Sequence, residues 1–286
     1  MSPQQSDRSA SIASGSTISA VLRSSPLGPL ETRILLSHAL NLSRVQLITQ
    51  SERVLTDDEL LRLSAGFRRR IDGEPIAYIV GEREFYGLSF RVTPDVLIPR
   101  PETELLVELA AGRLPENGRV LDMGTGSGAI AVAISHIRPD ASVTALDFSH
   151  AALDIARRNA LRHGAAVDFL HSDWYGALAD QRFDVIVANP PYIVEGDPHL
   201  SQGDLRFEPA DALTDHADGL SALRSIIAGA ARHLAPGGWL LTEHGYDQSE
   251  AVRGLLLAQG FHDVQSWQDL PGIMRATGGT RPIDHT

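Results

Sequence analysis

Short apolar runs alternate with helix-patterned stretches in the C-terminal part of the sequence. The runs Arg119–Met123, Ser142–Asp147 and Phe183–Ala188 are rich in Val, Ile, Leu and Ala, which is typical of strands buried on both faces of a sheet. The other elements expected are helices at 128–136 and 150–162, a strand at 167–170, a helix at 219–234, a turn at 236–238, a strand at 239–243, a helix at 248–258 and two strands around residues 264 and 274. The alternation predicts a doubly wound α/β fold with a parallel sheet, in which ligands bind beyond the carboxyl ends of the strands.

A glycine-rich turn follows the first of these strands. It is made of Gly124, Thr125, Gly126, Ser127 and Gly128. The glycines let the backbone approach a ligand where a Cβ would clash. With Ala129 the turn also matches the G-x-G-x-x-A pattern of dinucleotide enzymes, so a nicotinamide or flavin protein is an alternative at this point. Asp147, at the end of the next strand, is placed to accept both hydroxyl groups of a ribose.

Four residues directly after the strand Phe183–Ala188 carry the clearest chemical signal, namely Asn189, Pro190, Pro191 and Tyr192. An amide or an exocyclic base amine cannot be activated by removing a proton, because its pKa is far too high for a protein base. The Asn side-chain oxygen and a backbone carbonyl fixed by the Pro-Pro step can instead each accept one N–H of an NH₂ group, while the Tyr ring closes one face. The motif indicates methyl transfer to a planar nitrogen, and a plain turn after a strand is its alternative interpretation.

The residues after the third strand distinguish between the two cofactor classes. Asp173 is placed to accept a hydrogen bond from an adenine amine, and Trp174 offers a flat apolar wall, although a core tryptophan is the competing interpretation. A dinucleotide enzyme would need a hydride-transfer site and would not be expected to end its fourth strand in Asn-Pro-Pro-Tyr. The downstream residues therefore favour S-adenosylmethionine, whose cationic sulfonium also suits a site lined by Asp122 and Asp147.

Composition excludes several other classes of function. The sequence has no cysteine, so disulfides, thiolate metal sites and cysteine nucleophiles are excluded, and we expect no metal site. The net charge of −11 argues against a long nucleic acid as the main partner, because such a partner needs a basic surface. The first residues lack the pattern of a secretory signal, and no apolar run approaches the roughly 18 residues of a membrane span. We therefore expect a cytoplasmic protein without a membrane partner.

The N-terminal part differs in pattern from the rest of the chain. A Ser-rich start predicts disorder, and a capping box from Thr56 to Glu59 opens one of several short helical patterns that form a substrate-docking bundle. Two short strand patterns then fold about Gly87. The expected organisation is a disordered tail at 1–17, a helical docking domain at 18–82, a β-hairpin linker at 83–94, a main domain at 95–280 and a tail at 281–286.

The sequence is also similar to a known family over about residues 30–278. The segment 97–104, Leu-Ile-Pro-Arg-Pro-Glu-Thr-Glu, accompanies the hairpin, the glycine-rich turn and the Asn-Pro-Pro-Tyr motif. Together these residues resemble the PrmC/HemK family, the protein-glutamine methyltransferases that modify the glutamine of the Gly-Gly-Gln loop in class I peptide chain release factors. The resemblance implies a seven-stranded, mostly parallel, Rossmann-like methyltransferase sheet at 95–280, preceded by the helical bundle and the hairpin linker.

The resemblance further implies S-adenosyl-L-methionine as cofactor, class I release factors as partners and methyl transfer to the glutamine amide nitrogen by a monomer, in support of translation termination. The implied cofactor site comprises Gly124, Thr125, Gly126, Ser127, Gly128, Asp147, Trp174 and Asn189. The implied substrate site comprises Asn189, Pro190, Pro191, Tyr192, Arg100 and Glu102. Of these, the catalytic group would be Asn189, Pro190 and Tyr192.

Other functions fit parts of the same pattern. A nucleic-acid amino-methyltransferase acting on an adenine or guanine amine would use the same Asn-Pro-Pro-Tyr chemistry, but the acidic charge and the hairpin with its helical N-terminal module favour a protein substrate and no stable nucleic-acid partner. A non-catalytic S-adenosylmethionine-binding adaptor is a second alternative, and an oxidoreductase is a third.

Overall fold

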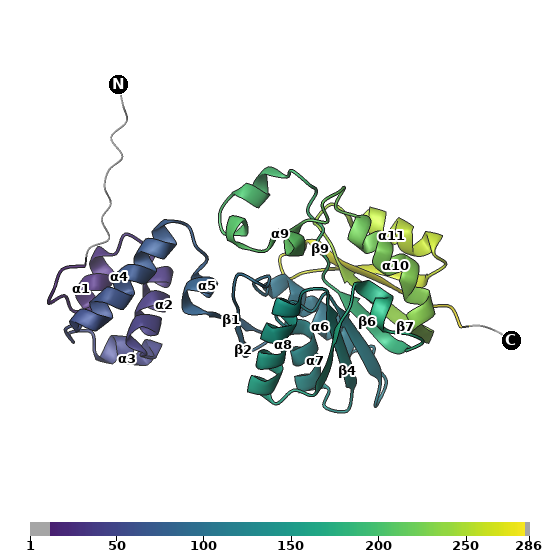
Figure 1. Ribbon diagram of the computed structural model, residues 1–286, viewed down its shortest axis with the longest axis horizontal. Coiled ribbons are helices and arrows are strands. Elements are labelled where there is room, and N and C mark those ends of the chain that lie inside the picture. Colours follow the sequence, from purple (N-terminus) through teal and green to yellow (C-terminus); the bar gives the residue numbers. More distant parts are fainter. Residues whose placement is uncertain (1–11, 284–286) are drawn as a thin grey trace, which may run out of the picture. The chain divides into compact units, whose positions relative to one another are not determined.

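The computed structural model describes residues 12–283, and contacts divide the chain into two units, Met1–Gly81 and Glu82–Thr286 (Figure 1). Residues 1–11 of the expected N-terminal tail and 284–286 of the expected C-terminal tail lie outside the described residues. Within the described part of the expected first tail, Thr17 caps the first helix by accepting from the backbone N–H of Ala20.

The first unit is helical, as its sequence pattern predicts. Its helices are α1 (Ile18–Ser24), α2 (Pro29–Leu40), α3 (Arg44–Thr49), α4 (Asp57–Ile71) and α5 (Ile76–Val80). Helix α4 begins at the predicted capping box, in which Thr56 accepts from the backbone N–H of Glu59 and Glu59 accepts from that of Thr56. Leu35, Leu63 and Phe67 belong to a buried apolar cluster that holds the helices together.

The second unit begins with a β-hairpin of β1 (Glu82–Phe85) and β2 (Leu88–Arg91). Its two-residue loop has positive φ at both Tyr86 (52°) and Gly87 (73°), as a type I′ turn requires. Phe85 and Phe90 contact each other edge to face at 6.0 Å, and both belong to the buried core of this unit. By its contacts the hairpin is therefore part of the second unit.

The large sheet has seven strands in the order β5-β4-β3-β6-β7-β9-β8. The strands are β3 (Arg119–Met123), β4 (Ser142–Asp147), β5 (Val167–His171), β6 (Phe183–Ala188), β7 (Leu234–Glu243), β8 (His262–Gln268) and β9 (Met274–Thr280). Strand β9 pairs antiparallel with both β7 and β8, and all the other pairings in the sheet are parallel. The predicted mostly parallel seven-stranded sheet is confirmed.

Helices cover both faces of the sheet (Figure 1). One face carries α6 (Glu104–Ala111), α7 (Ala129–Ile137) and α8 (His150–His163), and the other carries α10 (Ser221–His233) and α11 (Ser249–Ala258). Alternate residues of the central strands enter the two cores, so that Val120 packs on one side and Leu121 on the other. The shorter elements are η1 (Pro101–Thr103), η2 (Trp174–Ala177), η3 (Pro198–Ser201), η4 (Leu205–Phe207) and α9 (Ala210–Leu213).

One local prediction is wrong. The stretch 236–238, expected as a turn ahead of a strand, is an irregularity inside β7, which begins at Leu234. Phe183 pairs with Leu234, whereas Val185 pairs with Trp239, so β7 carries extra residues over that interval. A Pro-Gly-Gly sequence is typical of a turn between elements, but here β7 pairs with β6 both before and after it.

Gly229, in α10, lies against the ring of Tyr175 and leaves no room for a larger side chain. The hydroxyl of Tyr175 donates to the carbonyl of Ile226 at 2.6 Å, and a Cβ at Gly229 would lie 2.4 Å from two carbons of the ring. We expect Gly229→Ala to lower the free energy of unfolding by about 1–3 kcal/mol, because overpacking outweighs the gain in helix propensity. Urea denaturation measures this change.

Gly254, in α11, is the matched control. A Cβ there would meet no atom within 4 Å. Gly254→Ala is expected to raise the free energy of unfolding by up to about 1 kcal/mol through helix propensity alone. Equal stabilisation by the two substitutions would contradict the packing argument.

Candidate active site

A cavity of about 590 Å³ lies at the carboxyl ends of β3, β4 and β6. Strand β3 has β4 on one side and β6 on the other, so the segments that follow β3 and β6 diverge there. A doubly wound sheet binds its ligands at such a switch point. Segments 95–103 and 209–216 complete the cavity wall.

The glycine-rich turn forms one wall of this cavity. Gly124, Gly126 and Gly128 have φ values of 71°, 55° and 82°, a region that favours glycine. The backbone N–H of Gly124 donates to the carbonyl of Leu146 at 2.9 Å, which ties the turn to the end of β4. A Cβ at Gly128 would lie 3.1 Å from that of Ala156, so Gly128 permits close packing of α7 on α8 and does not line the cavity.

Asp147 lines the cavity from the end of β4. Its Oδ2 accepts from the backbone N–H of Gly126 at 2.9 Å, and its Oδ1 accepts from that of Ser149 at 2.9 Å. Burial raises the pKa of Asp147, while these hydrogen bonds oppose the rise. A carboxylate held in this way has lone pairs left to accept ribose hydroxyls, as its sequence position predicts.

Asp122 is fully buried close to the same turn. Its Oδ2 accepts from the hydroxyl of Thr125 at 2.6 Å and from the backbone N–H of Ala131 at 3.2 Å, whereas its Oδ1 has no hydrogen-bond partner. Burial raises the pKa of Asp122 to about 7. Asp122 was expected to line the donor site, but it does not line the cavity.

Asn159 holds the glycine-rich turn from behind, and sequence reasoning missed it. This buried side chain of α8 donates to the carbonyl of Ser127 at 2.8 Å and to that of Arg91 at 3.0 Å. Its oxygen accepts from the backbone N–H of Arg91 at 2.8 Å. The hairpin and the turn thus share one buried amide. The position of Asn159 on the apolar face of a predicted helix was a sign in the sequence that this Asn is buried and hydrogen-bonded.

Trp174 contacts both the cavity and the apolar core. It lines the cavity with Asp173, and it also packs against the apolar cluster on the α10 face of the sheet. Its φ is 44°, and its carbonyl accepts from the hydroxyl of Ser172 at 2.7 Å. The tryptophan is thereby fixed as part of the wall.

Asn189, Pro190 and Pro191 also line the cavity. They follow β6, whereas the glycine-rich turn follows β3, and these paired parallel strands end at the same edge of the sheet. The side-chain N–H of Asn189 donates to the hydroxyl of Thr103 at 3.1 Å, and that hydroxyl donates to Glu243 Oε2 at 2.7 Å. Tyr192 does not line the cavity, because its hydroxyl donates to the other oxygen of Glu243 at 3.3 Å.

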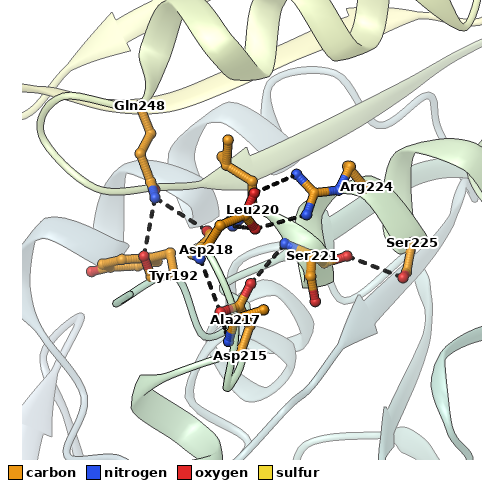
Figure 2. Close-up of polar contacts among 10 residues, drawn as sticks. Tyr192, Asp215, Ala217, Asp218, Leu220, Ser221, Arg224, Ser225 and Gln248 are labelled. Atoms are coloured by element: carbon orange, nitrogen blue, oxygen red, sulfur yellow. Dashed lines mark hydrogen bonds and ion pairs between the residues drawn. The ribbon is translucent and has the colours of Figure 1, made fainter. Parts of the chain in front are cut away.

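The backbone of Tyr192 is held by a second set of contacts (Figure 2). The amide N–H₂ of Gln248 donates to the carbonyls of Tyr192 at 3.0 Å and Gly219 at 3.1 Å. Asp215 accepts from the backbone N–H groups of Gly219 at 2.9 Å and Ser221 at 2.7 Å, which secures the start of α10. A Cβ at Gly219 would lie 2.6 Å from the carbonyl oxygen of Tyr192, so only glycine fits there.

Arg100 lines the cavity and forms an ion pair with Glu208, whose side chain is fully buried. Glu208 Oε2 also accepts from the backbone N–H of Ile98 at 3.0 Å. The carboxylate therefore joins two cavity walls that are far apart in sequence, and no local pattern marks it. Glu102, predicted at the entrance, does not line the cavity.

The structure thus gathers most of the predicted site residues into one cavity. Those that line it are Arg100, Gly124, Thr125, Gly126, Ser127, Asp147, Trp174, Asn189, Pro190 and Pro191. Sequence reasoning missed Thr103, which lines the cavity. It also missed four residues that support the wall without lining it, namely Asn159, Glu208, Glu243 and Gln248. Glu243 carried a usable signal, because it ends a predicted parallel strand.

Comparison with known proteins identifies the family. Residues 16–81 match the model of the PrmC N-terminal domain, and residues 101–206 match that of the methyltransferase small domain. A release factor glutamine methyltransferase of Burkholderia pseudomallei is 57% identical over 278 residues, covering 94% of this chain and 98% of the relative. The chain belongs to the release factor glutamine methyltransferase family.

A second member of the release factor glutamine methyltransferase family, from Neisseria gonorrhoeae, is 52% identical, covering 89% of this chain and 94% of its own. A crystal structure of a methyltransferase from Pyrococcus furiosus has the same fold, with a TM-score of 0.54 at 20% identity, covering 77% of this chain and all of that one. Membership makes the protein an S-adenosylmethionine-dependent methyltransferase, and the dinucleotide alternative is set aside.

The cavity fits S-adenosylmethionine. Gly124 and Gly126 leave its wall open to a ligand, and Asp147 has acceptor capacity for a ribose. No group of three or more potential metal ligands is present among residues 12–283. Within the same residues, no helix has the length and apolar character that crossing a membrane demands.

The burial of Asp122 predicts a pH-dependent stability. Its pKa is raised from 3.8 to about 7 in the folded protein, so between these values the unfolded chain loses this proton while the folded chain keeps it. The stability contributed by Asp122 is therefore lost as the pH rises through this window. Relative to the wild type, Asp122→Asn should become progressively more stable over the same window and then level off. Urea denaturation of the ligand-free proteins at a series of pH values measures the difference, and a constant difference would contradict the prediction.

Proposed function

We propose that the protein transfers the methyl group of S-adenosylmethionine to the side-chain amide nitrogen of the glutamine in the Gly-Gly-Gln loop of class I peptide chain release factors. The observation that carries this proposal is that Asn189 and Pro190 share one cavity with Asp147 and the glycine-rich turn. A donor site and a clamp for an NH₂ group thus open into the same space. Membership of the release factor glutamine methyltransferase family supports the choice of glutamine.

The donor half of the cavity would hold the cofactor, which supplies an electrophilic methyl group. Residues 124–127 would contact it through their backbone, Asp147 would accept its ribose hydroxyls, and Trp174 would border its adenine. Asn189 would lie between donor and acceptor.

The acceptor half would orient the glutamine amide. The Oδ1 of Asn189 and the carbonyl of Pro190 would each accept one N–H, so the face of the nitrogen is aimed at the methyl group. No general base is needed before attack, because the methylated nitrogen becomes strongly acidic and loses its proton to water. Pro191 and Arg100 would form the pocket wall. Tyr192 would act through its hydrogen bond to Glu243.

The same clamp would suit a base amine, so a nucleic-acid substrate is the second candidate. The net charge of −11 counts against it, because a nucleic-acid partner requires a basic surface. Action as a monomer, in the cytoplasm and without a stable nucleic-acid partner, stays a prediction of the sequence.

Removal of the Asn189 amide tests the acceptor clamp. We expect Asn189→Ala to lower kcat roughly 10²- to 10³-fold, because a preorganised acceptor of the substrate N–H is lost. Its dissociation constant for S-adenosylmethionine should change much less, since the glycine-rich turn and Asp147 are intact. Turnover assays and calorimetric titration separate the two effects, and near-normal turnover would contradict the proposed mechanism.

The substrate is tested by label transfer. The protein is incubated with methyl-labelled S-adenosylmethionine and a purified class I release factor, and one methyl group per release factor is expected. A release factor in which Ala replaces the glutamine of the Gly-Gly-Gln loop is the control. Label that persists on the control, or that enters RNA or DNA in a parallel reaction and not the release factor, would show that the acceptor is wrong.

A further inference from the structure

Three residues from separate segments form a hydrogen-bonded chain beside the cavity. Ala188 pairs with Thr242 in the parallel ladder of β6 and β7, so Asn189, just after β6, lies beside Glu243, the last residue of β7. Thr103, in η1, lies between their side chains, at 3.1 Å from Asn189 Nδ2 and 2.7 Å from Glu243 Oε2. Thr103 is 5% exposed and Glu243 is 3% exposed, so water cannot easily replace either group.

The direction of this chain follows from the chemistry of its members. An ionised carboxylate has no proton to donate, so it can only accept. The single hydroxyl hydrogen of Thr103 is therefore directed at Glu243, and the oxygen of Thr103 is left to accept. Asn189 must then turn its N–H₂ toward Thr103, which leaves its Oδ1 as the acceptor for the cavity.

We propose that Thr103 and Glu243 are positioning residues that fix the amide of Asn189 with its oxygen toward the substrate NH₂ group. This inference rests on the proposed function, in which Asn189 Oδ1 accepts an N–H of the substrate amide. An Asn amide has an oxygen and an NH₂ of nearly the same size, so without a fixed partner it can present either one. In the flipped orientation two NH₂ groups would face each other, and neither would be satisfied.

Tyr192 and the ionisation of Glu243 belong to the same arrangement. The hydroxyl of Tyr192 donates to the second oxygen of Glu243 at 3.3 Å, so an ionised Glu243 accepts from both neighbours. Burial raises the pKa of Glu243 to about 7, with Glu102 adding to the rise and Arg275 opposing it. A protonated Glu243 can donate to Thr103, and the hydrogen bonds from Asn189 through Thr103 to Glu243 then no longer have a fixed direction. The fixed orientation of the Asn189 amide is thus present at high pH and is lost as the pH falls through about 7.

The first test removes the hydroxyl of Thr103. Thr103→Val keeps the shape of the side chain, and we expect it to lower kcat for release factor methylation by roughly 10- to 100-fold through misorientation of Asn189. The KM for the release factor and the affinity for S-adenosylmethionine should change much less. Thr103→Ser restores the hydroxyl and should recover most of the lost kcat. Thermal unfolding of each variant checks that it is folded.

The second test removes the ionisation of Glu243. The wild type should lose kcat as the pH falls through about 7. Glu243→Gln places a donor and only one acceptor beside Thr103 and Tyr192, so kcat should be lower at every pH. The decrease in kcat as the pH falls through about 7 should also disappear. If Glu243 had a purely structural role, that decrease would remain in the variant. If Thr103→Val does not fold, Glu243→Gln still tests the proposed positioning role.

A third measurement is independent of activity. The side-chain N–H₂ signal of Asn189, assigned in NMR spectra by its loss in Asn189→Ala, should exchange with solvent more slowly in the wild type and Thr103→Ser than in Thr103→Val. Wild-type protein that does not methylate release factors would overturn the proposed function, and the exchange data would still decide the orientation. Active wild type with normal kcat in Thr103→Val, or exchange that is equal in all three proteins, would overturn the positioning role.

Discussion

The parallel pairing of β3 with β4 on one side and β6 on the other is the constraint on which the rest of the structure depends. The pairing brings the carboxyl ends of three strands to one edge, and the residues that follow them enter one cavity. The glycine-rich turn, Asp147 and the Asn-Pro-Pro motif therefore need no long-range contact of their own to meet. Strand pairing places each of them, because each lies at the end of a buried strand or directly after it.

Buried polar side chains then hold the segments that the sheet alone does not order. Asn159 ties the hairpin to the glycine-rich turn, Glu208 ties Arg100 to the opposite wall, and Glu243 joins Thr103 to Tyr192. Such groups are costly to bury without partners, so each is stable only when the segments it joins are in place. Together these contacts fix the segments that carry the glycine-rich turn, Arg100 and Asn189 at the cavity.

The fold and the cavity wall were largely predictable, whereas the support behind the wall was not. Arg119–Met123 and Phe183–Ala188 have the bounds that their apolar pattern predicts, because both strands are buried on two faces. The irregularity at 236–238 was not predicted, because its glycines favour a turn and only pairing with β6 keeps the chain in the sheet. The ring of Tyr192 was expected in the pocket, but its hydroxyl has a buried carboxylate as partner.

Most of the strands and helices, the glycine-rich turn and the Asn-Pro-Pro-Tyr motif were predictable from local sequence, because each depends on a local property such as apolar periodicity, glycine conformation or the rigidity of Pro-Pro. Which polar groups support these segments depends on how the folded chain packs. Thr103 and Glu243 are 140 residues apart. They meet because Ala188 and Thr242 pair near the ends of β6 and β7, and η1 lies against those ends. A hydrogen bond between segments so distant leaves no periodic pattern in the sequence, since its partners are chosen by the packing of the whole sheet.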